Sequence, residues 1–158
     1  ILIIYMAYNN NWGPLTWILF HTLTIKLKPE YYDSEKSELF GIIKSICNNL
    51  PCPYCREHAI MVINRVNINN FKRQNDLIKF IFNFHNEVNS RLKKKSYNYE
   101  ELEKKYKTAN TNKVCAAFVK IFELNSNNQR LLIDNFHRRK LITKFIDYYN
   151  KNKDKYNN

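Results

Sequence analysis

Apolar residues recur along most of the chain at the three- and four-residue spacing of amphipathic helices, and no segment alternates as a strand would. Pro14 suits the first turn of a helix over about residues 14–27, which Pro29 ends. The acidic start at Asp33 favours a second helix, which Pro51 stops. The apolar faces of these two helices are formed by Leu15, Ile18, Leu19, Thr22 and Ile25, and then by Leu39, Ile42, Ile43, Ile46 and Leu50.

The same spacing continues in the rest of the chain. It predicts a third helix over about residues 55–66, an Asn-rich loop over 67–75 and a fourth helix over 77–92. A short helix over about 99–107 and a Thr/Asn linker over 108–113 follow. Two more apolar faces lie beyond the linker: Val114, Phe118, Ile121 and Phe122, and then Leu132, Phe136, Ile142, Phe145, Ile146 and Tyr149. The pattern therefore predicts an all-α fold, in which a four-helix bundle carries a short fifth helix and a helical C-terminal extension.

A chain of 158 residues can form one domain with a sizeable core. We expect an N-terminal tail over 1–11, the bundle domain over 12–108 and the helical extension over 109–158, with a disordered Lys/Asn-rich end. The apolar faces of the extension imply packing against the bundle or against another protomer. The apolar run at residues 1–5 is too short to span a bilayer and lacks a charged flank, so we expect no signal peptide, no membrane and a start at Met6.

Composition narrows the possible functions. Only two glycines occur, Gly13 and Gly41, which excludes a glycine-rich loop for binding a phosphate or pyrophosphate. The net charge of +12 would attract nucleic acid or acidic partners non-specifically. A solvated surface in a chain rich in Lys and Asn is the favoured interpretation, because no motif for reading bases occurs.

The candidate chemistry lies in a C-x-x-C pair, Cys52 and Cys55, at the start of the predicted third helix. A thiolate at a helix N-terminus faces free N–H groups and the positive end of the helix dipole, and Arg56 adds charge. Cys55 shares the apolar face of the helix, while Cys52 lies toward its exposed start. The pair is therefore predicted to be a reactive dithiol with one inner and one outer sulfur.

Three other interpretations of the cysteine pair, or of the chain that carries it, remain as alternatives. Cys-Pro-Tyr-Cys is also the dithiol of glutaredoxins, but a flavin-free protein of that fold needs a β-strand before the motif, and residues 34–50 have helical spacing. A zinc site that uses His58 lacks a second close pair of ligands, so no metal is expected. A basic helical module that binds nucleic acid or assists assembly, without catalysis, is the alternative from another class.

Three separated segments carry a resemblance to a known family: W-G-P-L-T-W-I-L-F-H-T at residues 12–22, L-P-C-P-Y-C-R-E-H at 50–58 and H-N-E-V-N-S-R-L at 85–92. In this order on successive helices, they resemble the flavin-dependent sulfhydryl oxidases of the Erv/ALR family. The resemblance covers residues 12 to about 107. The short form, with Leu-Pro-Cys at the redox pair, is similar to the versions encoded by large cytoplasmic DNA viruses.

The resemblance implies a helical bundle that holds FAD without a Rossmann fold, with Cys52 and Cys55 as catalytic residues. The residues that it assigns to cofactor binding are Gly13, Trp17, His21, Cys55, His58, His85, Asn86, Val88, Asn89, Lys94 and Tyr106. These residue types fit the cofactor, since flat rings are held by aromatic surfaces and a pyrophosphate by cations and N–H donors. Trp12 is left as either a core or a cofactor residue.

The resemblance also implies an activity and partners. Electrons would pass from a dithiol protein substrate, a small thioredoxin-like carrier among the candidates, through the cysteine pair and FAD to dioxygen, giving hydrogen peroxide. Family members usually form homodimers through their first helices, so a homodimer is expected, although the C-terminal extension could alter the interface. A viral member would act in the cytoplasm of the infected cell or in the virion.

Two departures from the family concern cysteines. Many relatives carry a structural disulfide at positions that correspond to Asn64 and about Tyr99 here, so that bridge is absent. Many also carry a second, shuttle C-x-x-C, whereas Cys47 and Cys115 are single and distant. Cys47 is expected to be a buried, inert thiol. Direct transfer from the substrate to Cys52 is favoured, and a relay role stays open for Cys115.

Overall fold

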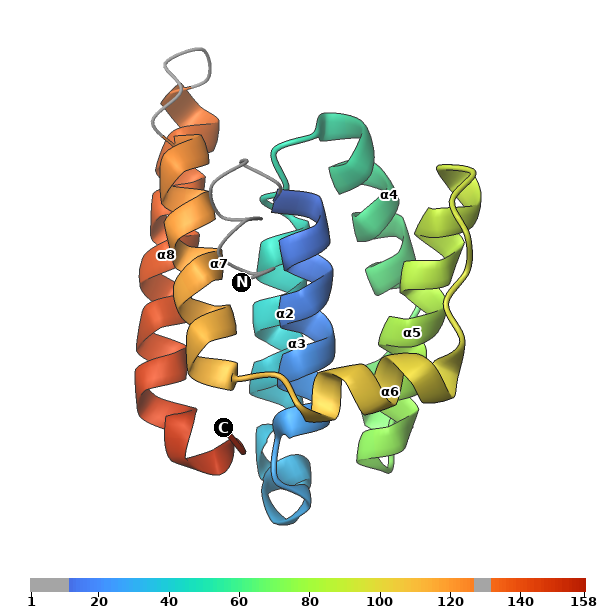
Figure 1. The fold of residues 1–158 in the computed structure, drawn as a ribbon. Coiled ribbons are helices and arrows are strands. Elements are labelled where there is room, and N and C mark those ends of the chain that lie inside the picture. Colours follow the sequence, from blue (N-terminus) through green and yellow to red (C-terminus); the bar gives the residue numbers. More distant parts are fainter. Residues whose placement is uncertain (1–11, 127–131) are drawn as a thin grey trace.

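The computed structural model describes residues 12–126 and 132–158, and almost all of them are helical (Figure 1). The only β-pairing among them is an isolated bridge between Leu27 and Tyr156. The α-helices are α2 (Trp12–Lys26), α3 (Tyr32–Cys47), α4 (Pro53–Asn64), α5 (Gln74–Arg91), α6 (Tyr99–Lys107), α7 (Thr111–Ser126) and α8 (Leu132–Asn152). Three 3-10 turns are η1 (Pro29–Tyr31), η2 (Ile68–Asn70) and η3 (Lys153–Lys155). The predicted all-α class is confirmed, and the predicted tail over 1–11 lies outside the described residues.

Polar side chains set several helix ends. The Asn98 side chain accepts hydrogen bonds from the backbone N–H groups of Glu100 and Glu101 and so begins α6 where the sequence predicts a helix. At α5, the Asp76 carboxylate accepts a 2.8 Å hydrogen bond from the backbone N–H of Arg73. This contact begins α5 three residues before the apolar pattern does, because capping needs no apolar side chain.

Helix α2 lies at the centre of the molecule. The α7–α8 pair packs on one side of it, α5 lies on the other, and α6 crosses its end (Figure 1). Its side chains are consequently buried on nearly every face, including Leu15, Leu19 and Leu23 at zero exposure. A helix enclosed on all sides does not have the single apolar stripe that the sequence analysis expected. The extension, whose apolar side chains contact α2 and α3, is the reason.

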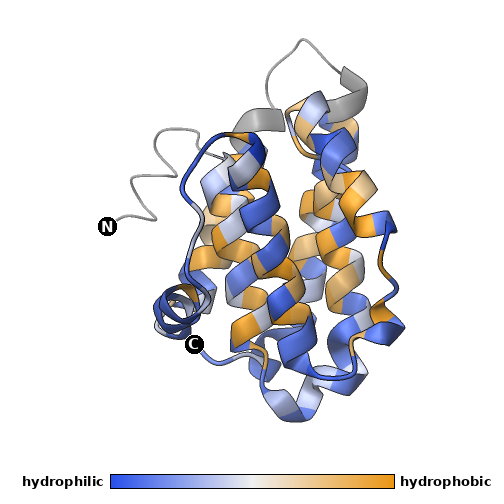
Figure 2. Cartoon of the chain, turned by 90° about the vertical axis from the view of Figure 1, so that its right-hand side faces the viewer, coloured by the Kyte–Doolittle hydropathy of each residue, from blue (hydrophilic) through white to orange (hydrophobic). Residues whose placement is uncertain are grey.

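The extension has an aromatic core of its own that continues into the bundle. Phe118 and Phe145 pack with ring centroids 5.0 Å apart, and Phe122 lies 4.3 Å from Phe118. All three side chains are almost fully buried. Hydrophobic and hydrophilic residues are interspersed along the helices of the molecule, as amphipathic helices require (Figure 2). The predicted packing of the extension against the bundle is confirmed.

The end of the chain is ordered, which corrects the expected disorder. The backbone N–H of Lys28 donates to the carbonyl of Lys155, and that of Asn157 donates to the carbonyl of Lys26. The Tyr156 side chain is buried and shares a hydrogen bond with the hydroxyl of Tyr148. The Lys and Asn content of this segment favours disorder, but backbone hydrogen bonds and one buried tyrosine hold it in place.

Candidate active site

Cys52 and Cys55 form a disulfide at the N-terminus of α4, with their Cα atoms 5.2 Å apart. Pro53 occupies the first helical position, where its missing N–H costs nothing. The Cys52 sulfur accepts a 3.2 Å hydrogen bond from the backbone N–H of Cys55 and so caps the helix. The same free N–H groups favour a thiolate once the disulfide is reduced. The predicted location of the pair at a helix start is confirmed.

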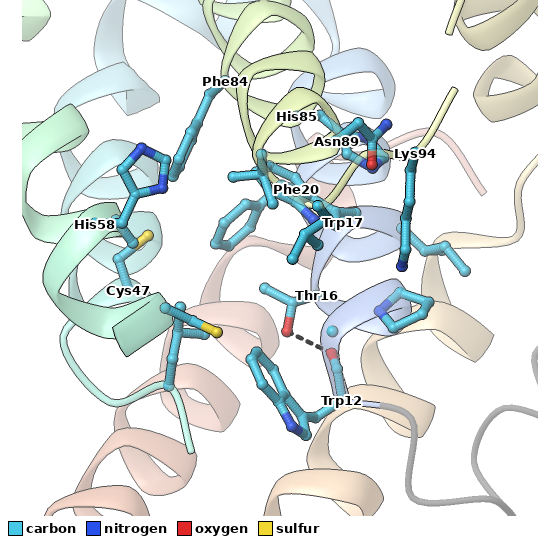
Figure 3. A pocket seen from close by; sticks show the side chains of 18 of the residues that line it. Trp12, Thr16, Trp17, Phe20, Cys47, His58, Phe84, His85, Asn89 and Lys94 are labelled. Atoms are coloured by element: carbon cyan, nitrogen blue, oxygen red, sulfur yellow. Dashed lines mark hydrogen bonds between the residues drawn. The ribbon is translucent and has the colours of Figure 1, made fainter. Parts of the chain in front are cut away.

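A cavity of about 240 Å³ lies beside this disulfide, bounded by α2, α4, α5 and α6 and by the segment that follows α5 (Figure 3). Cys55 lines it, whereas Cys52 does not. Both cysteines are half-buried. The inner sulfur of the pair therefore faces the cavity, and the outer sulfur lies outside it. The predicted site residues that line the cavity are Gly13, Trp17, Cys55, His58, His85, Val88, Asn89, Lys94 and Tyr106.

Flat aromatic surfaces form one wall of this cavity. The rings of Trp17 and His85 are stacked, with centroids 4.3 Å apart and planes 8° apart. His21 stacks on Tyr106 at 4.9 Å, and Phe84 meets Trp17 edge-on at 5.0 Å. Offset and edge-to-face contacts of this kind fix ring orientation as well as burying area. The wall is thus a rigid planar surface that a second flat ring system can contact.

His21 does not line the cavity but supports the wall from behind. Its Nε2 and the Nδ1 of His85 are 2.9 Å apart and share one hydrogen bond. Burial, together with the nearby charges of Lys105 and Lys94, lowers the pKa of His85 to about 4. The pKa of His21 is lowered well below its usual range. Burial is the largest cause, and the charges of His85 and Lys105 contribute less. Both rings are therefore neutral near pH 7, so one can donate and the other accept.

The neutral pair makes stability depend on pH. Unfolded His85 takes up a proton below its ordinary pKa of 6.5, whereas folded His85 stays neutral down to about pH 4. The unfolded state therefore binds more protons across this window, and the free energy of unfolding should fall as the pH drops, by at most about 1.4 kcal/mol per pH unit for one group. Thermal melts of flavin-free protein between pH 7 and about 4 should be less pH-dependent for His85→Gln than for wild type. The exposed His137→Gln variant is the control, and equal slopes in all three proteins would contradict the prediction.

A second histidine is held by a carboxylate. The Nε2 of His58, whose side chain is only 6% exposed, lies 2.9 Å from an Oε1 of Glu87, which is 44% exposed. His58 lies one turn after Cys55 on α4, and both line the cavity. The contact ties α4 to α5 next to the disulfide. Glu87 was not singled out from the sequence, although it is the middle residue of the H-N-E-V-N segment.

Asn86 faces away from the cavity. Its side-chain amide donates to the backbone carbonyl of Tyr97 at 3.1 Å, and its side-chain oxygen accepts from the backbone N–H of Tyr97 at 2.9 Å. These two hydrogen bonds hold the non-helical segment that follows α5 in place. The Tyr97 side chain then lines the cavity, 5.0 Å from the ring of His85. Asn86 is thus placed to position a cavity residue without lining the cavity.

Among the described residues, three cationic side chains also line the cavity. Lys93 adopts a positive φ of 55° just after α5, and the backbone N–H of Lys94 returns to the carbonyl of Asn89 at 2.8 Å. This left-handed turn is a common way to end a helix, and it brings the Lys94 side chain to the cavity. Lys105 from α6 and Arg91 from α5 line it as well. Such a group of cations suits an anionic ligand.

The residues present fit the flavin dinucleotide that the resemblance implies. The stacked wall offers planar surface for rings, and Lys94 and Lys105 offer charge for a pyrophosphate. Tyr106 and Tyr97 add further aromatic surface to the lining. Planar surface, cations and a redox disulfide thus surround one cavity.

Several cavity residues were missed by the sequence analysis or left undecided. Trp12 lines the cavity and also packs against the hydrophobic core. Tyr97 and Lys105 lie outside the three motifs, and only tertiary packing brings them in. Cys47 also lines the cavity, yet burial raises its pKa to about 12, so its thiol stays protonated near pH 7. The expectation of a buried thiol is confirmed, and its location beside Cys55 is new.

No helix in the described ranges 12–126 and 132–158 is long and apolar enough to cross a membrane. Within the same ranges, no three His, Cys, Asp or Glu side chains come together as a metal site would require.

Comparison with known proteins agrees with the geometry. The model of the Erv1/Alr family matches residues 14–107. The chain is 34% identical over 98 residues to a protein named FAD-linked sulfhydryl oxidase from African swine fever virus, covering 61% of this chain and 80% of the relative. It is 32% identical over 84 residues to a putative FAD-linked sulfhydryl oxidase of Invertebrate iridescent virus 3, covering 52% of this chain and 57% of that relative. No solved structure matches the chain significantly. Because the family model covers more than half of the chain, including the disulfide and most of the cavity lining, the chain belongs to the Erv1/Alr family.

Proposed function

We propose that the chain is a FAD-linked thiol oxidase, which forms disulfides in protein substrates and passes the electrons to dioxygen. One observation carries the proposal: a redox disulfide caps a helix N-terminus, and its inner sulfur lines a cavity built from stacked rings and cations. Relatives named FAD-linked sulfhydryl oxidase support it. A glutaredoxin-like reductase is disfavoured because α3, and not a β-strand, precedes the C-x-x-C pair.

The reaction at the disulfide follows from the placement of its two sulfurs. A substrate thiolate attacks the Cys52 sulfur, the Cys52–Cys55 bond breaks, and Cys55 leaves as a thiolate at the helix N-terminus. A second substrate thiolate then attacks the substrate sulfur of the mixed disulfide and releases Cys52. The substrate has lost two electrons and gained a disulfide, and the enzyme pair has become a dithiol. The two protons released from the substrate thiols pass to the enzyme pair or to solvent.

The cavity residues would hold the cofactor beside Cys55. Trp17, His85 and Tyr106 would contact its flat rings, and Lys94 and Lys105 its phosphates. His21 would keep His85 in orientation through their shared hydrogen bond. When bound, FAD supplies the acceptor for the electron pair of the Cys52–Cys55 dithiol and the route from there to dioxygen.

Substrate thiols reach Cys52 directly in this proposal. Burial raises the pKa of Cys47 and of Cys115 to about 12, and both side chains are nearly inaccessible. A relay thiol has to be exposed and readily ionised, and neither residue meets these conditions. The substrate is therefore a protein that carries its own dithiol, such as a small thioredoxin-like carrier.

The visible absorption spectrum of the purified protein tests the function. We expect a flavin spectrum that bleaches when a dithiol is added under argon and returns when air is admitted. The reason is that the Cys52–Cys55 pair couples the added dithiol to the cofactor. A protein that stays colourless after incubation with FAD would contradict the proposal. It would favour the basic helical module, whose binding to nucleic acid should weaken steeply with salt.

We also propose that the chain forms a homodimer and acts in the cytoplasm of the infected cell or in the virion. The viral relatives support the location. A dimer through the first helix, as expected for relatives, is disfavoured, because α7, α5 and α6 cover α2 and leave Pro14 as its one exposed residue. Sedimentation as a monomer at micromolar concentration would exclude the dimer, and secretory-compartment staining in expressing cells would exclude the location.

A further inference from the structure

A groove of about 990 Å³ runs between α3 and α8, and none of its lining residues belongs to the cavity at the disulfide. Gly41 lies in its floor, where a Cβ atom would meet nothing within 4 Å. Ile42 and Tyr148 lie beneath it, and both side chains are almost fully buried. The groove is therefore open space over an apolar floor, large enough to take a side chain from another molecule.

Cations dominate its rims. Four cations line the groove: Arg139, Lys140, Lys144 and Lys151. Among the described side chains, two carboxylates line it, Glu38 and Asp147, and the Nζ of Lys151 is already 3.3 Å from Glu38. Phe136 is 56% exposed at one end, with the Nζ of Lys140 4.7 Å from its ring centre. An exposed phenylalanine held by a cation is a typical contact residue, not a core residue. The groove thus presents apolar surface and positive charge together.

One end of the groove lies at the same end of the bundle as the disulfide, and the other reaches Lys151 in the last turn of α8. The Nζ of Lys144 donates a 2.8 Å hydrogen bond to the hydroxyl of Ser45, which lies in the last turn of α3. The chain leaves α3 at Cys47 and reaches Cys52 five residues later. Figure 1 shows the end of α3, the start of α4 and the first turns of α8 at one end of the molecule. A protein that offers a thiol to Cys52 can therefore also reach the groove.

These observations identify the kind of partner. We propose that the groove docks an acidic, apolar-containing segment of the dithiol protein that Cys52 oxidises, a proposal that rests on the oxidase function above. Carboxylates of the segment would meet Arg139, Lys140 and Lys144, while an apolar side chain would fill the space over Gly41. A nucleic-acid backbone would use the cations but leave the apolar floor empty. One rim comes from α8, outside the family match over 14–107, so this docking site is particular to chains with such an extension.

The test compares a large and a small substrate. Oxygen consumption is measured with dithiothreitol and with a reduced dithiol peptide that carries an Asp/Glu-flanked leucine segment. For the variant Lys140→Glu with Lys144→Glu, we expect KM for the acidic peptide to rise about tenfold. KM for dithiothreitol should not change, because dithiothreitol needs to reach only Cys52. Lys113→Glu with Lys120→Glu on α7 makes the same change in net charge away from the groove, and it should leave both substrates unaffected.

A second variant separates shape from charge. Gly41→Leu fills the floor without altering charge, and it should raise KM for the acidic peptide while leaving dithiothreitol oxidation intact. About 1 M salt, where screening acts within ~3 Å, should remove the effect of the charge reversals but not that of Gly41→Leu.

Unchanged KM values for the acidic peptide in both groove variants, with normal dithiothreitol oxidation, would overturn the docking site alone. Loss of oligonucleotide binding in the charge-reversal variant, with peptide KM unchanged, would replace it with a nucleic-acid site. A change in oligomeric state without a change in KM would make it an interface between copies. A wild-type protein inactive even on dithiothreitol would overturn the oxidase function and this proposal with it.

Discussion

Replacing Cys55 by serine should lower thiol oxidation by at least about 10³-fold while the protein stays yellow. Serine cannot form the disulfide that the substrate thiol attacks, and its hydroxyl is not ionised at neutral pH. The flavin should still bind, because the stacked wall formed by Trp17 and His85 and the cations of the cavity are untouched. Oxygen consumption with a dithiol and the visible spectrum measure the two properties separately.

Cys47→Ala is the matched control for this variant. It removes the other thiol of the same cavity, which is buried and has its pKa raised to about 12, so activity should stay within a few-fold of wild type. Full activity of Cys55→Ser would refute the dithiol mechanism. Equal loss in both variants would instead show that Cys47 takes part in the thiol exchange.

Phe118→Ala should destabilise the whole protein by about 3–5 kcal/mol, although the residue lies outside the family match. Its side chain is fully buried between Phe122 and Phe145, so truncation leaves a cavity that rigid helices cannot close. The midpoint of thermal unfolding should fall by roughly 10 °C. If the extension and the bundle share one core, the temperature at which the flavin is released should fall together with the temperature at which the helical signal is lost.

Phe136→Ala provides the comparison within the extension. Its side chain is 56% exposed, so stability should change by less than about 0.5 kcal/mol. A flavin release temperature that is unaffected by Phe118→Ala would mean that the extension unfolds separately from the bundle, contrary to the packing of α7 on α2.

The helices were the most predictable part of the fold. The range of α6 agrees with the sequence prediction because Asn98 and the linker supply local signals at both ends. The start of α5 was placed late because capping by Asp76 is independent of the apolar pattern. The ordered end of the chain was missed because its contacts join residues that are more than one hundred positions apart, such as Leu27 and Tyr156. A pattern within a short stretch of sequence cannot predict such a pairing.

The site was predictable where chemistry and helical spacing coincide. Trp17 and His21 lie four residues apart on α2, and the structure brings both to His85. Helical spacing alone could not predict that His21 supports the wall from behind, because this position depends on how α5 and α6 pack. Lys105 and Tyr97 carry no motif at all, and they reach the cavity only through α6 and through the contact of Tyr97 with Asn86.

The enclosure of α2 has a consequence for how the chain is made. Helix α2 is the first described element to leave the ribosome, yet α7, which covers one side of it, begins almost one hundred residues later. At about 5–20 residues per second, the side of α2 that α7 covers stays open for roughly 5–20 s. The apolar surface on that side is therefore available to chaperones, or to other nascent chains, until α7 has been translated. Yield of folded protein should accordingly depend more on synthesis rate and chaperone supply than on the stability of the finished fold.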